Sequence, residues 1–289
     1  MNAQPLVSVL MTAWNREKYI TEAIESVLAS TYLNFELIIV DDFSEDETVS
    51  IAQTFAVKDV RILVHVNKEN LGQFQNRNYA ASLAKGEYIM YVDSDDTIAK
   101  DAIEHIVTHL TNHPGCNFGM IYLGKDACEP FVLSPEQAVY NHLFKKTILH
   151  IGPGGTILNR KFFTEIGGYP TSYGAAGDMY FNIKAASNTS IVFLPYNYLT
   201  YRKHQGQELN NQYQYLFNGY KYFNDILELP ELPLTAIQRA WLSKKNKRRF
   251  ILSMCKYFIS SRNLLKTAQA INMAGFTFKD ALVGVFHFN

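Results

Sequence analysis

Three aspartates lie within four residues at the end of an apolar segment. Residues 88–92 are apolar or aromatic, and Asp93, Ser94, Asp95 and Asp96 follow directly. Carboxylates this close repel one another unless a cation lies among them, and Mg²⁺ and Mn²⁺ prefer hard oxygen ligands of this kind. Asp93 and Asp95, spaced i and i+2, would hold such a cation together with a bound diphosphate. The competing interpretation is a helix start, because acidic side chains stabilise the first turn of a helix.

The two interpretations can apply to different members of this cluster. We expect Asp96 and Thr97 to begin the helix that follows, over 102–110. Asp93 and Asp95 would then face the ligand. The repulsion between the acids is tolerable if a cation lies among them.

The elements that must position the cluster alternate between strand and helix along the first hundred residues. Short apolar, β-branched segments predict buried strands, and the segments between them carry apolar residues at helical spacing. Residues from Ser44 to Thr48 would cap the second helix, and Gly86 would close the third. The alternation predicts an α/β fold with a mostly parallel sheet covered by helices on both faces. The expected strands are 6–12, 35–40, 61–66 and 87–92, and the expected helices are 16–29, 49–56 and 75–83.

Polar residues follow several of these strands at the point where each strand ends. They are 12–16, the pair Asp41 and Asp42, Asn70, and 93–96. The carboxyl ends of parallel strands meet at one edge of a sheet, and ligands of α/β sheets bind beyond that edge. The sequence therefore predicts one site to which four separate segments contribute.

Beyond residue 100 the pattern is less regular and then becomes helical. A helix opens near Asp178. Leu209 begins a series of apolar residues at helical spacing, Pro230 interrupts it, and Thr235 starts a further helix. The other expected elements are strands over 118–124 and 191–195 and a short helix over 161–166.

Several blocks in the sequence resemble the family-2 glycosyltransferases of the GT-A fold, a bacterial-type class that uses nucleotide-diphosphate sugars. They are VSVLMTAWNREKYITEAIESVL, IIVDDFSEDET, NLGQFQNRN, GEYIMYVDSDD, GGYP and YRKHQGQ. Each block alone is weak, but their order and spacing from 6 to 207 make the resemblance specific. It implies a Rossmann-like GT-A domain with a nucleotide-binding half over 1–100, an acceptor-binding half over 101–208, and a helical C-terminal extension over 209–289 that is basic from 235.

The resemblance implies that the nucleobase of the donor, usually uracil, lies at the ends of the first two strands. A carboxylate can accept the imide N–H of uracil. Ala13 lacks the hydroxyl that the family often has there, so a base contact would use its backbone. Trp14 would stack on the base or pack in the core, and Asp42 would bind the base or order the loop before Thr48. The residues concerned are Thr12, Ala13, Trp14, Asn15, Asp41 and Asp42.

The resemblance also implies how the diphosphate and the metal are held. Arg77 would neutralise phosphate or order the aspartate loops, although a helix-surface arginine is an equal alternative. Asp95 would ligate Mn²⁺ or Mg²⁺ directly, Asp93 would contact ribose or the metal shell, and His204 would complete that shell or bind the diphosphate. The remaining donor-binding residues in this prediction are Asn70, Ser94, Gly154 and Gly155, the glycines allowing a close approach of the chain.

The general base implied by the resemblance is Asp178. The family often has Glu-Asp at this helix start, and here Gly177 replaces the Glu while Asp178 remains. A helix N-cap is the alternative role for this carboxylate. The implied reaction is inverting transfer of a hexose from a UDP-sugar to a hydroxyl of a saccharide or lipid-linked acceptor, in the synthesis of polysaccharide, lipopolysaccharide or another envelope glycan.

Two other functions compete with this one. A nucleotidyltransferase would also use an α/β sheet and carboxylate-bound metal, but it should carry a Gly-rich loop after the first strand, and TAWNREKY has no glycine. A catalytically silent sugar-nucleotide-binding or assembly protein would not need the acids. The presence of Asp93, Asp95, Asp178 and His204 together argues against it.

Charge and cysteine content bear on where the protein works. From Thr235 onward ten Lys and Arg residues face one acid, Asp280, so this part carries a net charge of +9 in a chain whose formal net charge is zero. Such helices would lie on an anionic membrane or merely cover the catalytic domain; no nucleic-acid module accompanies them. The three cysteines are widely spaced, which is typical of free thiols in a reducing compartment. The sequence also shows no signal-like start and no apolar run of ~20 residues. These features predict a cytoplasmic protein, with or without contact to the inner face of the plasma membrane.

Overall fold

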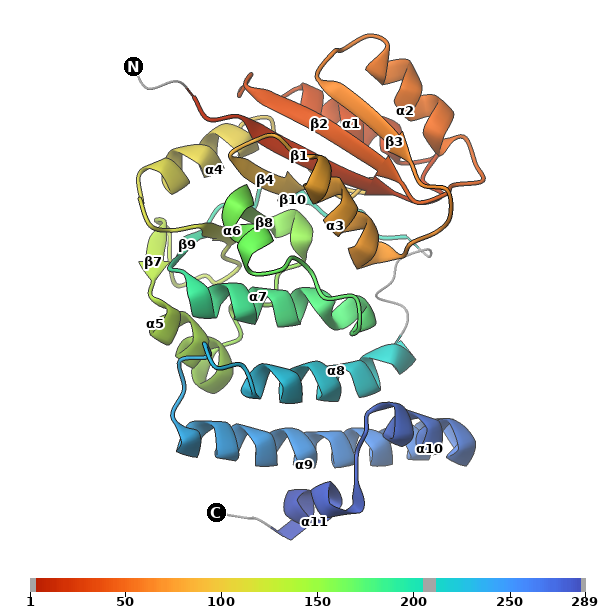
Figure 1. Ribbon diagram of the computed structural model, residues 1–289, viewed down its shortest axis with the longest axis vertical. Helices are drawn as coiled ribbons and strands as arrows, with labels where there is room; N and C mark the ends of the chain where they lie inside the picture. The colour runs from red at the N-terminus through yellow and green to blue at the C-terminus, as the bar shows by residue number, and fades with distance from the viewer. Residues whose placement is uncertain (1–3, 205–211, 287–289) are drawn as a thin grey trace.

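An eight-stranded sheet runs through the computed structural model, which describes residues 4–204 and 212–286 (Figure 1). Its strand order is β3-β2-β1-β4-β8-β6-β9-β7. Most neighbours are parallel, while β8 is antiparallel to both of its neighbours and β7 is antiparallel to β9. The predicted mostly parallel sheet is therefore confirmed. The strands are β1 (Val7–Ala13), β2 (Phe35–Asp41), β3 (Ile62–Val66), β4 (Tyr88–Tyr91), β6 (Phe118–Ile121), β7 (Phe131–Leu133), β8 (Thr156–Asn159) and β9 (Ile191–Leu194).

Helices cover both faces of this sheet, as Figure 1 shows. Alternate strand residues point to opposite faces: Leu10 and Ile38 belong to one buried cluster, and Val9 and Leu37 to the other. Burial on both faces explains why the strands read as continuous apolar runs. The helices are α1 (Ile20–Leu28), α2 (Thr48–Ala56), α3 (Gln73–Leu83), α4 (Ala102–Thr111), α5 (Pro135–Tyr140), α6 (Arg160–Glu165) and α7 (Gly177–Asn188).

Four more helices stack below α7 and form the C-terminal extension (Figure 1). Tyr220 and Phe250 pack together between α8 and α9, with ring centroids 4.6 Å apart. Thr235 caps α9 as predicted, through a capping box with Gln238. Leu209 of the predicted apolar series lies outside the described residues. The helices are α8 (Gln212–Leu227), α9 (Ala236–Ser261), α10 (Leu264–Met273) and α11 (Phe278–Phe286).

The predicted helix start at Asp96 and Thr97 is wrong. Thr97 begins a short strand, β5 (Thr97–Ile98), which pairs with β10 (Leu199–Thr200), and α4 starts only at Ala102. Local pattern could not reveal this pairing, because its partner strand lies about a hundred residues further on.

One predicted helix end is also wrong. Gly86 does not close α3, which ends at Leu83 with Ala84 as its C-cap; Gly86 instead donates its N–H to the Ser8 hydroxyl. The start of α2 does fall within the predicted 44–48, with Glu47 as the N-cap and the Thr48 N–H donating to Asp46, while Ser44 hydrogen-bonds to Asp41.

Candidate active site

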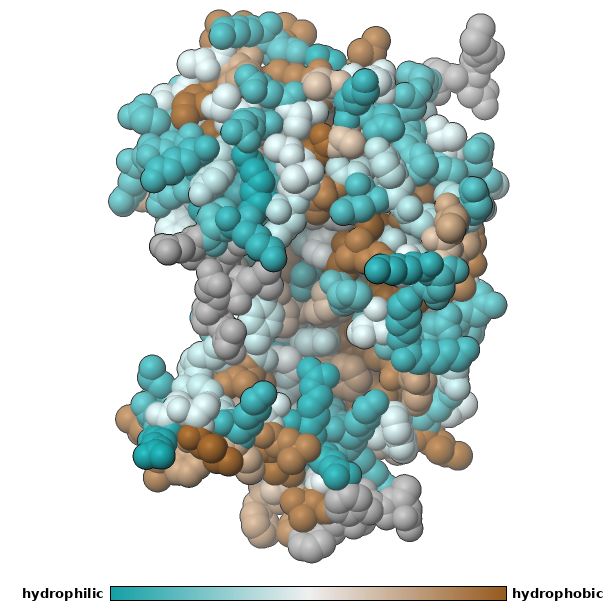
Figure 2. Space-filling view, turned by 180° about the vertical axis from the view of Figure 1, so that it is seen from behind, coloured by the Kyte–Doolittle hydropathy of each residue, from teal (hydrophilic) through white to brown (hydrophobic). Residues whose placement is uncertain are grey.

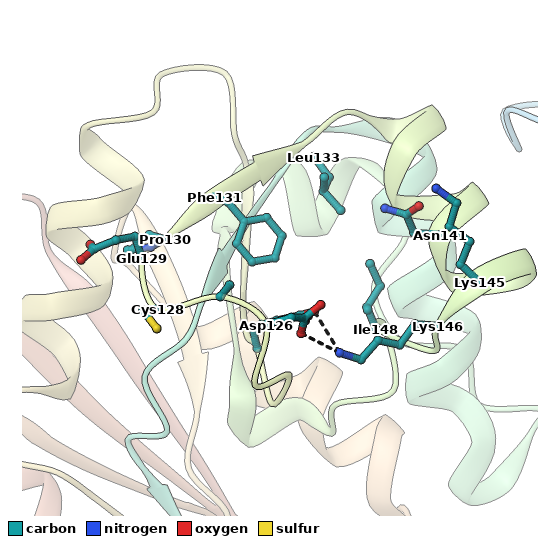
Figure 3. A pocket seen from close by; sticks show the side chains of 12 residues that line it. Asp126, Cys128, Glu129, Pro130, Phe131, Leu133, Asn141, Lys145, Lys146 and Ile148 are labelled. Carbon is teal, nitrogen blue, oxygen red and sulfur yellow. Dashed lines mark hydrogen bonds and ion pairs between the residues drawn. The ribbon is translucent and has the colours of Figure 1, made fainter.

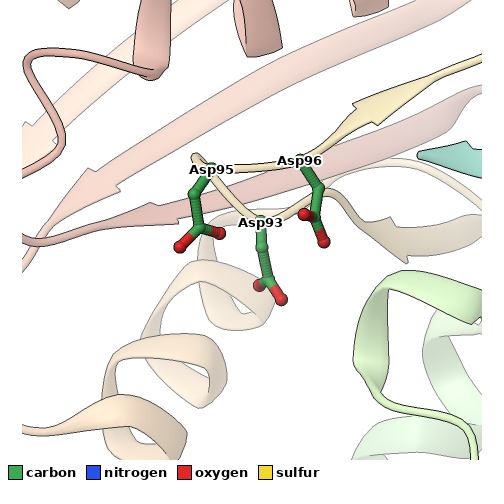
Figure 4. A group of neighbouring side chains, drawn as sticks. All are labelled: Asp93, Asp95 and Asp96. Atoms are coloured by element: carbon green, nitrogen blue, oxygen red, sulfur yellow. The ribbon is translucent and has the colours of Figure 1, made fainter. Parts of the chain in front are cut away.

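The three aspartates lie together in the loop between β4 and β5, which we call the acid loop (Asp93–Asp96). Each of Asp93, Asp95 and Asp96 places a carboxylate oxygen within 4.8 Å of the others (Figure 4). The Ser94 hydroxyl donates to the Thr12 carbonyl over 2.8 Å and so fixes this loop to the end of β1. The loop is therefore built to hold its acids at short range.

Two arginines and a histidine from three other segments contact the acid loop. Arg77 of α3 is buried and donates from Nη2 to Asp93 Oδ1 over 2.5 Å. Arg16 Nε and His204 Nε2 both lie on Asp95 Oδ2, at 3.0 and 2.8 Å. The helix-surface alternative for Arg77 is therefore wrong, and the guanidinium groups of Arg77 and Arg16 offset part of the repulsion among the acids.

Asp96 is the most deeply buried member of the acid loop. Burial raises its pKa to about 7, the Asp93 and Asp95 carboxylates add to the rise, and the Arg202 N–H, which donates to Asp96 Oδ1, opposes it. The sequence pattern assigned this residue to a helix cap. The structure brings it to the metal-competent cluster instead.

The donor atoms of the acid loop fit a divalent metal ion. Three carboxylates offer hard oxygen ligands close together, and the His204 imidazole already touches one of them. Mg²⁺ and Mn²⁺ accept such oxygen donors, and Mn²⁺ also accepts imidazole. The residues that the sequence singled out for a metal, Asp93, Asp95 and His204, are thus brought together.

The two aspartates after β2 are tied into the protein by hydrogen bonds. Asp41 accepts from the backbone and hydroxyl of Ser44, and burial raises its pKa. Asp42 accepts from the N–H groups of Leu71 and Gly72. Asp42 therefore orders the loop before α3, not the loop before Thr48, and its contact with a nucleobase stays a prediction.

The loop after β1 is open to solvent. Trp14 is 52% exposed, so the core alternative for this side chain is wrong. Asn15 adopts a left-handed backbone with φ of 53° and accepts from the Glu45 N–H, while the neighbouring Ala13 is buried. A cavity of about 590 Å³ beside this loop is bounded by Asn15, Arg16, Tyr19 and His204, among others.

Asn70 and Gly155, unlike Gly154, have structural reasons for their residue types. The Asn70 side chain donates to the Asp42 carbonyl over 3.1 Å. A Cβ at Gly154 would lie 3.4 Å from Leu199, and a Cβ at Gly155 would collide with Ile151. Packing therefore demands glycine at 155 but would accept a Cβ at 154, and the predicted contact of both residues with a sugar stays a prediction.

Asp178 lies in the first turn of α7 and does not cap that helix. The Asp178 carboxylate faces Gly152, where a Cβ would stand 4.0 Å from Oδ2, at ordinary contact distance. Burial raises the pKa of Asp178 to about 6, with the Met179 N–H and Arg77 acting in the opposite direction and Asp93 adding to the rise. Asp178 therefore lies within electrostatic range of Arg77 and of Asp93 in the acid loop.

The sheet order, the helices on both faces and the acid loop at the strand ends define the GT-A class of transferase. The family model for "Glycosyl transferase family 2" matches residues 8–167, more than half of the chain, and the chain belongs to that family. The matched residues include the acid loop but stop before Asp178 and His204.

Curated relatives agree with this assignment. A putative teichuronic acid biosynthesis glycosyltransferase, TuaG, of Bacillus subtilis is 35% identical over 51% of this chain and 60% of its own length. The glycosyltransferase GlyG of Streptococcus pneumoniae is 41% identical over 34% of this chain and 33% of its own length. The alignments thus span less than two thirds of these relatives.

Solved structures share the fold over nearly the whole chain. The S. aureus protein TarS, residues 1–349 in complex with UDP-GlcNAc, superposes with a TM-score of 0.73 at 23% identity, covering 96% of this chain and 81% of that one. The mannosyltransferase PcManGT from Pyrobaculum calidifontis, in complex with GDP-Man and Mn²⁺, gives 0.65 at 16% identity, covering 99% and 88%. No helix of residues 4–204 and 212–286 has the length and hydropathy of a membrane span.

Proposed function

We propose that this protein transfers a hexose from a UDP-sugar to a hydroxyl of an acceptor glycan in cell-envelope synthesis, with inversion at the anomeric carbon. The observation that carries the proposal is the position of Asp178 within electrostatic range of the acid loop, with a pKa of about 6. A carboxylate with this pKa is ionised at neutral pH and is a stronger base than an ordinary aspartate. UDP-sugar binding is supported by the fold shared with TarS, which was solved with UDP-GlcNAc and with UDP.

The division of labour follows the predicted regions of the chain. Residues 1–100 bind the nucleotide, through Asp41, Asp42 and the loop after β1. Residues 101–208 bind the acceptor, and residues 209–289 form the extension. The acid loop and His204 would hold Mn²⁺ or Mg²⁺, whose positive charge stabilises the negative charge on a departing diphosphate.

In the transfer step the acceptor oxygen bonds to the anomeric carbon from the face opposite the diphosphate. Asp178 takes the hydroxyl proton, the bond from carbon to diphosphate breaks, and UDP leaves with the electron pair. One displacement inverts the configuration and forms no covalent sugar–enzyme intermediate. Arg77 fixes Asp93 in place, and its guanidinium keeps positive charge beside the diphosphate.

The C-terminal extension supports contact with an anionic membrane as part of the same proposal. From Thr235 onward it carries a net charge of +9, and α9 has large exposed hydrophobics, such as Leu252 at 59% and Ile259 at 74% exposed. Figure 2 shows hydrophobic and hydrophilic surface mixed at this end of the molecule. Basic residues beside exposed apolar ones are typical of helices that lie on anionic lipid.

Calorimetric titration of UDP with and without Mn²⁺ tests the donor and metal assignments. We expect Mn²⁺ to strengthen UDP binding to the wild type but not to Asp95→Ala, whose fold is checked by circular dichroism. Equal UDP affinity in the two proteins with Mn²⁺ would refute the role of Asp95. Release of UDP from a UDP-sugar in the presence of acceptor would exclude a catalytically silent binding protein.

A further inference from the structure

A second pocket, of about 650 Å³, lies on the acceptor side of the sheet (Figure 3). We call it the β6–β7 pocket; the residues used below are Tyr122, Asp126, Cys128, Phe131, Asn141 and Lys145. None of these residues belongs to the site described above. Its walls come from the segment after β6, from β7 and from the turn that follows α5.

The interior of the β6–β7 pocket combines aromatic surface with polar groups at the rim. The Phe131 ring stacks on Phe193 with centroids 5.2 Å apart, and Tyr122 stands edge-on to Phe131 at 5.0 Å. At the rim Asp126 pairs with Lys146 over 2.8 Å, as Figure 3 shows. Apolar walls with a few polar groups of both signs suit a neutral sugar ring, whose hydroxyls donate and accept hydrogen bonds.

The polar wall is a π-helix, Asn141–Lys145, a rare conformation that is frequent at functional sites. The His142 ring holds it against the next segment, because Nδ1 accepts from the N–H groups of Ile148 and Leu149 at 3.2 and 3.0 Å. Burial lowers the pKa of His142 to about 4, so the ring stays a neutral acceptor. The pocket is therefore preformed.

The same segment connects the pocket to the proposed base. Asn182 lies one helical turn after Asp178 on α7, and its side chain donates to the carbonyls of Leu149 and Ile151 at 3.0 and 2.8 Å. Ile148 lines the pocket, and Gly152 faces Asp178. A buried amide thus fixes the distance between pocket and base.

The distance between the pocket and the acid loop matches a short oligosaccharide. Tyr122 follows β6, two strands from β4 in the sheet, and Phe131 lies on β7, four strands from β4, so the pocket walls stand roughly 10–20 Å from β4. A single sugar ring does not span that distance.

We infer that the β6–β7 pocket binds a sugar ring of the acceptor next to the sugar that reacts, so that the acceptor is at least a disaccharide. The inference rests on the proposed function, because it assigns the reacting hydroxyl to Asp178. The transfer reaction itself does not require this contact between a second acceptor sugar and the β6–β7 pocket.

Cys128 allows the pocket to be blocked without a substitution in its walls. It is exposed at the pocket, whereas Cys116 is buried and burial raises the pKa of its thiol. In a Cys255→Ser background, Cys128 is modified either with the small methylthio group or with fluorescein maleimide, and mass spectrometry verifies a single site. The two modified proteins differ in the size and charge of the group placed at the pocket and have the same pocket walls.

Both proteins are applied, with UDP and Mn²⁺, to an array of mono-, di- and trisaccharides, and UDP affinity is measured by calorimetry. We expect the methylthio protein to bind certain oligosaccharides and not their monosaccharide components, and the fluorescein protein to lose that binding with UDP affinity unchanged. The inference would be overturned if monosaccharides bound with the same affinity as oligosaccharides, or if no saccharide on the array bound. It would also be overturned if the fluorescein protein bound oligosaccharides as the methylthio protein does. Absence of UDP binding in both proteins would instead count against the proposed function.

Discussion

The Arg16 guanidinium forms an ion pair with the Asp95 carboxylate, with 3.0 Å between Nε and Oδ2, although the two residues are 79 positions apart. The oxygen that Arg16 contacts is the one that also contacts His204. Arg16 and a metal ion would therefore compete for the same carboxylate.

Removing this competitor should strengthen metal binding. We expect Arg16→Gln to raise the affinity for Mn²⁺ in the absence of nucleotide by roughly three- to tenfold, because a half-buried ion pair is worth about 1 kcal/mol. Electron paramagnetic resonance of free Mn²⁺ measures the change. Arg61→Gln is the matched control, since Arg61 pairs with Asp59 away from the acid loop; equal Mn²⁺ affinity in Arg16→Gln and wild type would contradict the competition.

Asp178→Asn should abolish base catalysis and keep the fold. We expect turnover to fall by roughly 10²–10⁴-fold with UDP affinity unchanged. Coupled detection of released UDP gives the rate, and Glu165→Gln, at an exposed position on α6, controls for loss of a surface acid. A fully active Asp178→Asn enzyme would remove Asp178 from the role of base.

The pH dependence follows from the raised pKa of Asp178. Only the ionised carboxylate accepts a proton, so kcat should rise about tenfold per pH unit below pH 6 and level off above it. The folded protein holds this proton more tightly than the unfolded chain, so the contribution of Asp178 to stability is full below pH 3.8 and is lost as pH rises through 6. Asp178→Asn should therefore be no less stable than wild type at pH 8 in thermal melts. A kcat that stays constant from pH 5 to 8 would be inconsistent with this base.

Gly86 and Gly219 provide a matched test of packing. A Cβ on Gly86 would lie 2.6 Å from the Ser8 backbone nitrogen, whereas one on Gly219 within α8 meets nothing within 4 Å. We expect Gly86→Ala to lower the free energy of unfolding by about 1–3 kcal/mol and Gly219→Ala to raise it by about 0.5–1 kcal/mol. Urea unfolding measures both, and destabilisation by Gly219→Ala to the same extent would show that the two sites do not differ as described.

Membrane contact by the extension is tested by vesicle flotation. We expect wild type to float with phosphatidylglycerol vesicles and not with pure phosphatidylcholine, and Leu252→Glu with Ile259→Glu to lose that flotation. The double control Leu33→Glu and Val57→Glu changes two residues of the catalytic domain that are together more exposed than the α9 pair. Flotation that survives in the α9 variant would rule out this face as the lipid contact.

The sequence was sufficient for the sheet and for much of the site. Continuous apolar runs marked β1, β2 and β4 because these strands are buried on both faces. The polar residues after them do converge, since parallel strands end at one edge. Arg77 and His204 were singled out by resemblance, and the structure places both on the acid loop.

The sequence was insufficient where a role depends on a distant partner. The strand β8 has four residues after a glycine-rich turn, too few for periodicity to identify. The pairing of Thr97 with β10 and the contact of Arg16 with Asp95 join segments far apart in the chain. Nothing local to Asp96 distinguishes a helix cap from a buried member of a cluster.

The contact of Arg202 with the acid loop also bears on the order in which this protein folds. The Arg202 N–H and guanidinium bind Asp96 Oδ1 and the Asp95 carbonyl, across 106 and 107 positions of sequence. Contacts between residues this far apart in the sequence form only after the chain has lost the conformational entropy that closing a long loop costs. A nascent chain that has emerged only as far as β9 already contains all three aspartates but neither Arg202 nor His204. The acid loop is therefore completed only once residues 202–204 have emerged, so the final shape of the donor half depends on the end of the acceptor half.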